Sequence, residues 1–154
     1  MNLLPACSFV VVHLILMQKN RVLLGLRTRT GFADGMYGLP AGKVEVGESV
    51  LAGMIREAKE ELGIEIRESD LELSSMIYHL WTDKVQTQSN IFFVCRKFSG
   101  KIVNAEPEKC GTLKFFSLKR LPKNIIPFMA EGLHNHMKKI KYSEFGWDKK
   151  AYDI

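Results

Sequence analysis

One amphipathic helix constrains the fold of this sequence more than any other feature. Ser49 is a good N-cap residue and Gly63 a good C-terminal stop, so together they predict a helix over residues 50–62. At about 100° per residue the apolar side chains form a single stripe, which comprises Leu51, Met54, Ile55, Ala58 and Leu62. A helix with one such stripe must pack on other elements of the fold, and here we expect a sheet.

Several apolar segments predict that sheet. Residues 8–17 are rich in Val, Ile and Leu, and the polar residues 18–20 separate them from a second run at 22–26, which predicts a hairpin. Residues 28–38 predict a glycine-containing loop that leads to a short extended segment near Val44. Further strands are predicted at 71–81, 87–98 and 112–117, and Pro127 opens a closing helix that runs to about Ile140. This order predicts an α+β fold, an α/β/α sandwich with a central mixed sheet.

The composition fits one globular domain. The 154 residues are 46% hydrophobic and 25% charged, without repeats or linker-like tracts, so residues 1–154 are expected to form a single domain. Three cysteines without CxxC spacing indicate neither a disulfide framework nor a zinc site, which fits a reducing cytoplasm. The apolar N-terminal run is shorter than the roughly 20 residues that span a bilayer, so no membrane association is expected.

The basic charge of the chain is weak evidence about its partners. The formal net charge is +5 with a pI near 9.1, and the excess lies largely near the C-terminal end, where a basic tail is expected at about 141–154. Trp81 and Trp147 are far apart in the sequence, so the tail lacks a platform of interleaved aromatic residues for stacking on bases. A solvated basic face is commoner, and nucleic acid is not expected as a partner.

One edge of the predicted helix breaks the local rules of helix stability. Glu57, Glu60 and Glu61 fall within an arc of about 100°, and Gly53 lies on the same edge. Like charges at these spacings repel, acidic residues near a helix C-terminus oppose its dipole, and glycine costs about 1 kcal/mol relative to alanine. A solvated acidic face is one explanation. The other is a site for a hard divalent cation such as Mg²⁺, which takes carboxylate oxygens and binds together with phosphates.

The spacing of these residues resembles the Nudix box, G-x5-E-x7-R-E-U-x-E-E-x-G-U, in which U is a bulky or aliphatic residue. Gly42, Glu48, the run 56–61 and Gly63 supply every fixed position, and Ala58 is the one soft match. With the box at 42–64, the order of the flanking strands is also similar to a Nudix domain over most of the chain. The resemblance implies a hydrolase that cleaves a nucleoside diphosphate linked to another group, X, with Mg²⁺ or Mn²⁺ as cofactor.

The resemblance also implies roles for individual residues. Three carboxylates would bind the metal: Glu57, Glu60 and Glu61. The backbone carbonyl of Ala41 and the side chain of Glu48 are further candidate ligands, and Arg56 would orient a carboxylate by a charge-assisted hydrogen bond. Bound metal would neutralise the pyrophosphate charge and lower the pKa of a water, whose proton a glutamate would take. We assign that base to Glu57, so the expected catalytic residues are Glu57, Glu60 and Arg56.

Residues outside the box resemble MutT-like nucleoside triphosphate hydrolases. The similarity lies in residues 104–110 and 113–116, and in that branch an acidic residue of this loop can join the metal site, with Glu106 as the first candidate and Glu108 the second. Arg27 ends a predicted strand and could reach a substrate phosphate, and Gly42 is a second candidate substrate-binding residue. Asn124 precedes the closing helix, near the position of an asparagine that reads the purine in MutT, and an amide presents both donor and acceptor. As surface or turn residues these side chains would look the same in sequence.

The sequence therefore predicts a MutT-like pyrophosphohydrolase. It would convert a (deoxy)nucleoside triphosphate, with damaged nucleotides among the candidates, to a monophosphate and pyrophosphate. Three other linked diphosphates stay open as substrates: a nucleotide sugar, a dinucleoside polyphosphate and an RNA 5′ end. A non-catalytic nucleotide-binding Nudix module is the alternative from another class, although such modules usually carry degenerate boxes. A homodimer is common among similar proteins and stays an open expectation.

Overall fold

A strand that is apolar on both faces organises the sheet. In the computed structural model, which describes residues 6–81 and 86–147, this strand is β1 (Ser8–Gln18). Leu14 and Leu16 pack into the core on one side of the sheet, and Ile15 and Met17 pack into the core on the other. Burial of both faces explains why the sequence of this strand is a nearly continuous apolar run.

The sheet is mixed and holds eight strands of the described residues. Their order is β3-β2-β1-β6-β5-β8, with β4 paired to β1 and β7 paired to β2. The β1–β6 and β5–β8 pairs are parallel and the others antiparallel. The remaining strands are β2 (Arg21–Arg27), β3 (Tyr37–Gly38), β4 (Ala41–Lys43), β5 (Leu71–Trp81), β6 (Gln86–Cys95), β7 (Cys110–Ser117) and β8 (Tyr142–Phe145).

The first helix, α1 (Val50–Leu62), begins and ends where its caps predict. The Ser49 hydroxyl accepts a hydrogen bond from the Ala52 N–H at 3.1 Å, and Gly63 ends the helix with a φ of +67°. Met54, Ala58 and Leu62 are fully or almost fully buried against the sheet. The apolar stripe thus fixes which edge of α1 stays free to carry its carboxylates. A 3-10 turn, η1 (Glu68–Asp70), follows before β5.

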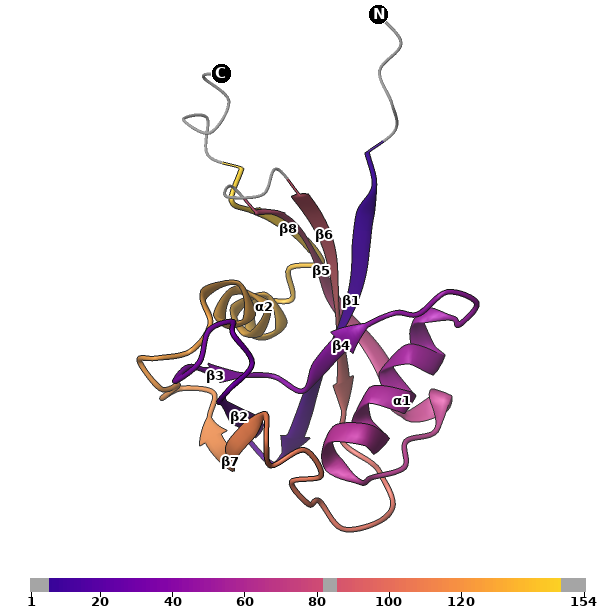
Figure 1. Cartoon of the computed structure of the whole chain (residues 1–154), viewed down its shortest axis with the longest axis vertical. Helices are drawn as coiled ribbons and strands as arrows, with labels where there is room; N and C mark the ends of the chain where they lie inside the picture. The colour runs from indigo at the N-terminus through magenta and orange to yellow at the C-terminus, as the bar shows by residue number, and fades with distance from the viewer. Residues whose placement is uncertain (1–5, 82–85, 148–154) are drawn as a thin grey trace, which may run out of the picture.

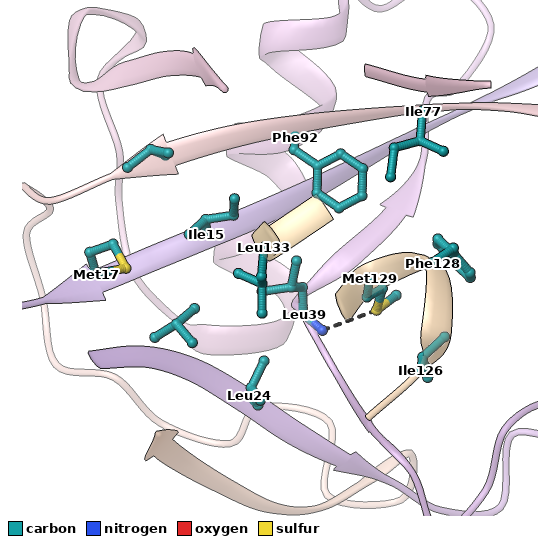
Figure 2. Packing of buried hydrophobic residues seen from close by; sticks show 12 residues of the cluster. Ile15, Met17, Leu24, Leu39, Ile77, Phe92, Ile126, Phe128, Met129 and Leu133 are labelled. Carbon is teal, nitrogen blue, oxygen red and sulfur yellow. Dashed lines mark hydrogen bonds between the residues drawn. The ribbon is translucent and has the colours of Figure 1, made fainter. Parts of the chain in front are cut away.

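The second helix, α2 (Pro127–Lys138), covers the opposite face of the sheet (Figure 1). Pro127 occupies the first turn, as predicted, and the helix ends at Lys139 in the left-handed conformation with a φ of +58°. Phe128, Met129 and Leu133 are buried in the second core, where they surround the β1 and β2 side chains (Figure 2). The Leu39 N–H also donates to the Met129 Sδ at 3.2 Å, which ties the segment before β4 to this helix (Figure 2).

Two features of the fold differ from the sequence-based expectation. The two-residue strand β3 was not predicted, and the segment expected to begin a basic tail at about 141 instead forms β8, which pairs with β5 from Met76 to His79. The part of the expected tail at 148–154 lies outside the described residues. No helix among the residues described is both long enough and apolar enough to cross a bilayer.

Candidate active site

A cleft of about 550 Å³ lies between the acidic edge of α1 and the ends of β2 and β7. It brings together eight of the residues singled out from the sequence, namely Arg27, Ala41, Gly42, Arg56, Glu57, Glu60, Glu61 and Glu106. The floor is formed by residues 38–42, which lead from β3 into β4. The cleft therefore joins the Nudix box to a loop that follows it by more than forty residues in the sequence.

Arg56 links the carboxylates at one end of this cleft. Its Nε and Nη2 donate to the two carboxylate oxygens of Glu48 at 3.1 and 2.7 Å, which is a bidentate pair. Its Nη1 donates to Glu57 at 2.9 Å and to Glu60 at 3.0 Å, and Nη2 also donates to the Lys43 carbonyl at 3.0 Å. One guanidinium thus offsets the repulsion among three acidic side chains, and it fixes where Glu48 and Glu57 point.

Two glycines leave the space that these carboxylates occupy. A Cβ placed on Gly42 would overlap the Glu57 carboxylate, whose three nearest atoms all lie well inside van der Waals contact. A Cβ on Gly53 would meet the Glu48 Oε1 at 3.0 Å and the Val44 Cγ2 at 3.3 Å, which is tight but not an overlap. The glycine that looked out of place in the middle of α1 therefore lies against Glu48, and Gly42 allows Glu57 to lie directly on the backbone of β4.

Glu61 is the most buried carboxylate of the cleft. Burial is the main cause that raises the pKa of Glu61 to about 8, and the nearby carboxylates of Glu57 and Glu106 raise it further. The Ala41 N–H, which donates to Glu61 at 3.2 Å, acts in the opposite direction. A carboxylate held in this way favours either a proton or a cation.

Two carboxylates that pair with Arg56 differ in their electrostatic environment, and of these Glu57 lines the cleft whereas Glu48 is not among the described residues that line it. Burial raises the pKa of Glu57, although the hydrogen bond from Arg56 opposes the effect. The pKa of Glu48 is lowered to about 2, chiefly by its hydrogen bonds to Arg56, and these pairs in turn raise the pKa of the guanidinium. Glu48 and Arg56 therefore stay charged at neutral pH, whereas Glu57 lies closer to the range in which a group can accept and release protons.

The loop 103–110 brings Glu106 to the carboxylates of α1. The Ala105 N–H donates to the Glu61 carbonyl at 3.1 Å, and the Thr28 N–H donates to the Lys109 carbonyl at 2.9 Å. The loop is thus fixed both to the end of α1 and to the residue after β2. Within it the Glu106 carboxylate pairs with the Lys109 ammonium at 2.8 Å. Lys109 also lines the cleft, and sequence reasoning missed it.

The arginines of the glycine-containing loop have unequal freedom. The Arg27 guanidinium donates to the Phe32 carbonyl at 2.9 Å and to the Thr30 hydroxyl at 3.1 Å, and it lies over the Phe32 ring. Arg29 lines the cleft as well, and it forms no ion pair with any of the residues that the structure describes. Arg27, the candidate phosphate-binding residue from the sequence, and Arg29 both line the cleft.

Asn124 and Glu108 are not among the described residues that line the cleft. The Asn124 side chain donates to the Gly35 carbonyl at 2.9 Å, and its backbone carbonyl accepts from the Tyr37 N–H at 2.8 Å. Asn124 thus holds the end of the loop that follows Arg27 and contains Arg29. Its role in reading a base stays a prediction.

The chemistry of the cleft fits Mg²⁺ or Mn²⁺. Its candidate ligands are carboxylate oxygens, which hard divalent cations prefer, and the desolvated Glu61 carboxylate has one N–H as its hydrogen-bond partner in the described structure. Among residues 6–81 and 86–147, no three His, Cys, Asp or Glu side chains already converge as a ligand cage. The cause is visible in the contacts of Arg56, because Glu57 and Glu60 both turn toward it. Ligation would therefore require these carboxylates to reorient.

Comparison with known proteins decides the family. The family model described as "NUDIX domain" matches residues 8–136, which is most of the chain. The chain belongs to the Nudix family. The fold prediction is confirmed by solved structures, since a MutT NUDIX hydrolase from Burkholderia pseudomallei is similar with a TM-score of 0.77 and 27% identity, over 84% of this chain and 98% of that one.

Two further structures extend the similarity of fold. The MutT protein from Methanosarcina mazei Go1 matches with a TM-score of 0.73 and 18% identity, over 88% of this chain and 97% of that one. The ORF135 protein of E. coli matches with a TM-score of 0.71 and 22% identity, over 86% of this chain and 91% of that one. This Nudix protein is thus a hydrolase of the pyrophosphatase type whose structural neighbours are MutT-like.

Proposed function

We propose that this Nudix hydrolase converts a (deoxy)nucleoside triphosphate to a nucleoside monophosphate and pyrophosphate with Mg²⁺ or Mn²⁺. The observation that carries the proposal is the division of charge across one cleft. Glu57, Glu60 and Glu61 lie along its α1 wall, and cationic side chains from the loop after β2 and from the loop 103–110 line it as well. A metal-bound triphosphate requires carboxylates that hold the divalent cation and cationic side chains that hold the phosphates.

The residues of the cleft have distinct roles in this proposal. Glu57, Glu60 and Glu61 would hold the cation together with the Ala41 carbonyl and Glu106, and Glu48 is a further candidate ligand. When bound, the metal would neutralise charge on the pyrophosphate and lower the pKa of a water. Glu57 is the proposed acceptor of the proton from the attacking water, because its carboxylate is partly desolvated, is hydrogen-bonded to Arg56 and lies in the space left by the missing side chain at Gly42.

Arg56 acts as a positioning residue. It carries three hydrogen bonds to Glu48 and Glu57, which keep the base from turning away from the cleft. Arg27 and Arg29 contact substrate phosphates, and the backbone of Gly42, which lines the same cleft, is a further contact. Asn124 is proposed to read the base or to place the loop that does. We further propose that the protein acts in the cytoplasm, with a homodimer as the candidate assembly.

The decisive experiment is a substrate panel with identification of the products. The panel contains ordinary and oxidised nucleoside triphosphates, a nucleotide sugar, a dinucleoside polyphosphate and a triphosphorylated RNA, each with Mg²⁺ or Mn²⁺. We expect a triphosphate to give pyrophosphate and monophosphate, rather than orthophosphate and diphosphate. Preference for any other panel member would replace the proposed substrate, and binding without turnover across the panel would indicate a non-catalytic module.

Variants connect that activity to the cleft. Glu60→Gln and Glu61→Gln should each lose about 100-fold or more of the activity, because a metal ligand is lost, while the fold is retained. Glu65→Gln is the matched control, since Glu65 follows α1 and is exposed outside the cleft. Wild-type turnover by both cleft variants would refute the assignment of the metal site.

A further inference from the structure

Lys109 occupies a fixed place at the acidic end of the cleft. The backbone N–H groups of Lys109 and Cys110 both donate to the Glu106 carbonyl at 3.0 Å. These bonds form a turn across which the side chains of Glu106 and Lys109 pair. The Lys109 carbonyl accepts from the Thr28 N–H at 2.9 Å. The backbone of Lys109 is therefore held next to the end of β2, while its ammonium is free to move on a flexible stem.

The partner of Lys109 is a carboxylate that the metal site also needs. Glu106 lines the same cleft as Glu57 and Glu61, and its charge contributes to the raised pKa of both. Its carboxylate is 2.8 Å from the Lys109 Nζ and is mostly shielded from solvent, with 28% of its side chain exposed. A divalent cation that approaches Glu106 must compete with this ammonium.

Two other cations of the cleft, Arg56 and Arg27, are held by more contacts with the protein than Lys109 is. Arg56 has three carboxylate partners and Arg27 has two oxygen partners in its own loop. Lys109, in contrast, has one described side-chain partner and a side chain that is 56% exposed. An ion pair of this kind contributes little free energy, so it can be exchanged for another partner at small cost.

We propose that Lys109 is a phosphate-binding residue that exchanges partners during substrate binding. Before the cation binds, its ammonium neutralises Glu106 and competes for that carboxylate. When the metal takes the Glu106 oxygen, the ammonium is released and pairs with a substrate phosphate at the same end of the cleft. The exchange keeps the charge balanced at each stage, and it rests on the proposed function of the cleft as a metal–polyphosphate site.

The exchange predicts opposite effects on two ligands, which a purely structural role would not produce. In Lys109→Gln, Mn²⁺ alone should bind about threefold more tightly, because its competitor is removed. Pyrophosphate, titrated in the presence of saturating Mn²⁺, should bind about tenfold more weakly, because one charge-assisted contact is lost. Electron paramagnetic resonance of free Mn²⁺ gives the first affinity, and calorimetry gives the second. Lys101→Gln is the matched control, since Lys101 is exposed outside the cleft and should change neither value.

A double-mutant cycle separates the exchange from a general effect of charge. Removing any cation near the cleft would tighten Mn²⁺ binding to some extent through long-range electrostatics. If Lys109 acts through Glu106, most of the tightening must be lost when Lys109→Gln is made in a Glu106→Gln background, and only the small long-range part should remain. Tightening of the same size in both backgrounds, an unchanged or weakened Mn²⁺ affinity in the single variant, or an unchanged pyrophosphate affinity would each overturn the proposal.

These measurements need no turnover, so the two proposals fail in different ways. A protein that shows the expected Mn²⁺ and pyrophosphate affinities but hydrolyses no nucleotide would refute the proposed function and leave the exchange intact. A protein that hydrolyses triphosphates, with the same Mn²⁺ affinity in Lys109→Gln as in the wild type, would support the function and refute the exchange.

Discussion

Replacing Gly42 with alanine should abolish most of the activity while leaving the fold stable. The new methyl group would overlap the Glu57 carboxylate, and ordinary contact begins at about 3.4 Å, so the carboxylate must withdraw by more than about 1 Å. Withdrawal breaks the geometry in which the Arg56 Nη1 donates to Glu57 at 2.9 Å. Gly42 has no positive φ, so alanine itself fits its backbone conformation, and the steric effect is directed at Glu57.

The expected loss in kcat is about 100-fold, because a displacement of about 1 Å at a reacting group costs that much. Stability should change by less than about 1 kcal/mol. Alanine lowers the conformational entropy of the unfolded chain, which contributes about 0.4–1 kcal/mol, and this gain offsets the weakened contact between Glu57 and Arg56. Steady-state release of pyrophosphate measures the first quantity and urea unfolding measures the second.

A control and a double variant test the cause. Gly111→Ala places its methyl 3.3 Å from the Thr28 Cγ2, in a strand but outside the cleft, and should keep full activity. If Gly42→Ala acts through Glu57, then combining it with Glu57→Gln should slow the enzyme no further than the slower single variant. Near-normal kcat in Gly42→Ala, or losses that multiply in the double variant, would refute the reasoning.

Three other perturbations should behave differently. Gly132→Ala should lower the free energy of unfolding by about 2 kcal/mol, because its methyl group would overlap the buried Phe92 ring. Calorimetry should show a Tm lower by roughly 4–8 °C, with normal kcat per folded molecule, and an unchanged Tm would contradict the packing. Glu48→Gln should lower activity about 10- to 100-fold with the fold intact, because Arg56 loses its bidentate partner, and kinetics at saturating Mn²⁺ would show whether metal affinity is the cause. Burial lowers the pKa of His13 from 6.5 to about 4, so the unfolded chain binds this proton first, and the contribution of His13 to the free energy of unfolding should fall by about 2 kcal/mol between pH 7 and 5. Urea titrations at the two pH values should show this as the difference between the wild type and His13→Gln.

The fold was predictable where local signals and burial agree. Ser49 and Gly63 define α1 because caps act through neighbouring backbone groups, and β1 is recognisable because both its faces are buried. The strand β8 gave no such signal. Its segment, 142–145, alternates exposed and half-buried side chains beside lysines, and it becomes a strand only because β5 offers a parallel edge. Pairing partners that are sixty residues away leave no trace in a local pattern.

Which residues meet at the candidate cleft could be predicted only where their positions follow from a local pattern. Glu57, Glu60 and Glu61 share an edge because helical periodicity is local, and the repulsion that marks them in the sequence is offset by Arg56 in the structure. Lys109 was missed because its position at the cleft depends on a loop that is hydrogen-bonded to both α1 and the residue after β2. The bonds that Arg27 forms within its own loop were hidden in the same way.

The position of the cleft follows from how β1 shares one of its edges. On this edge, β4 pairs with β1 from Val11 to His13, and β2 pairs with β1 at Met17 and Gln18. The two partner strands therefore diverge beyond Leu14, whose N–H donates to the Pro40 carbonyl at 2.9 Å. The sheet therefore opens between β2 and β4, and residues 38–42 cross this opening with glycines at both ends. Because α1 packs on the same side through Met54 and Ala58, its acidic edge lies along the opening. The carboxylates of this edge therefore lie where the sheet is split, next to the backbone of β4.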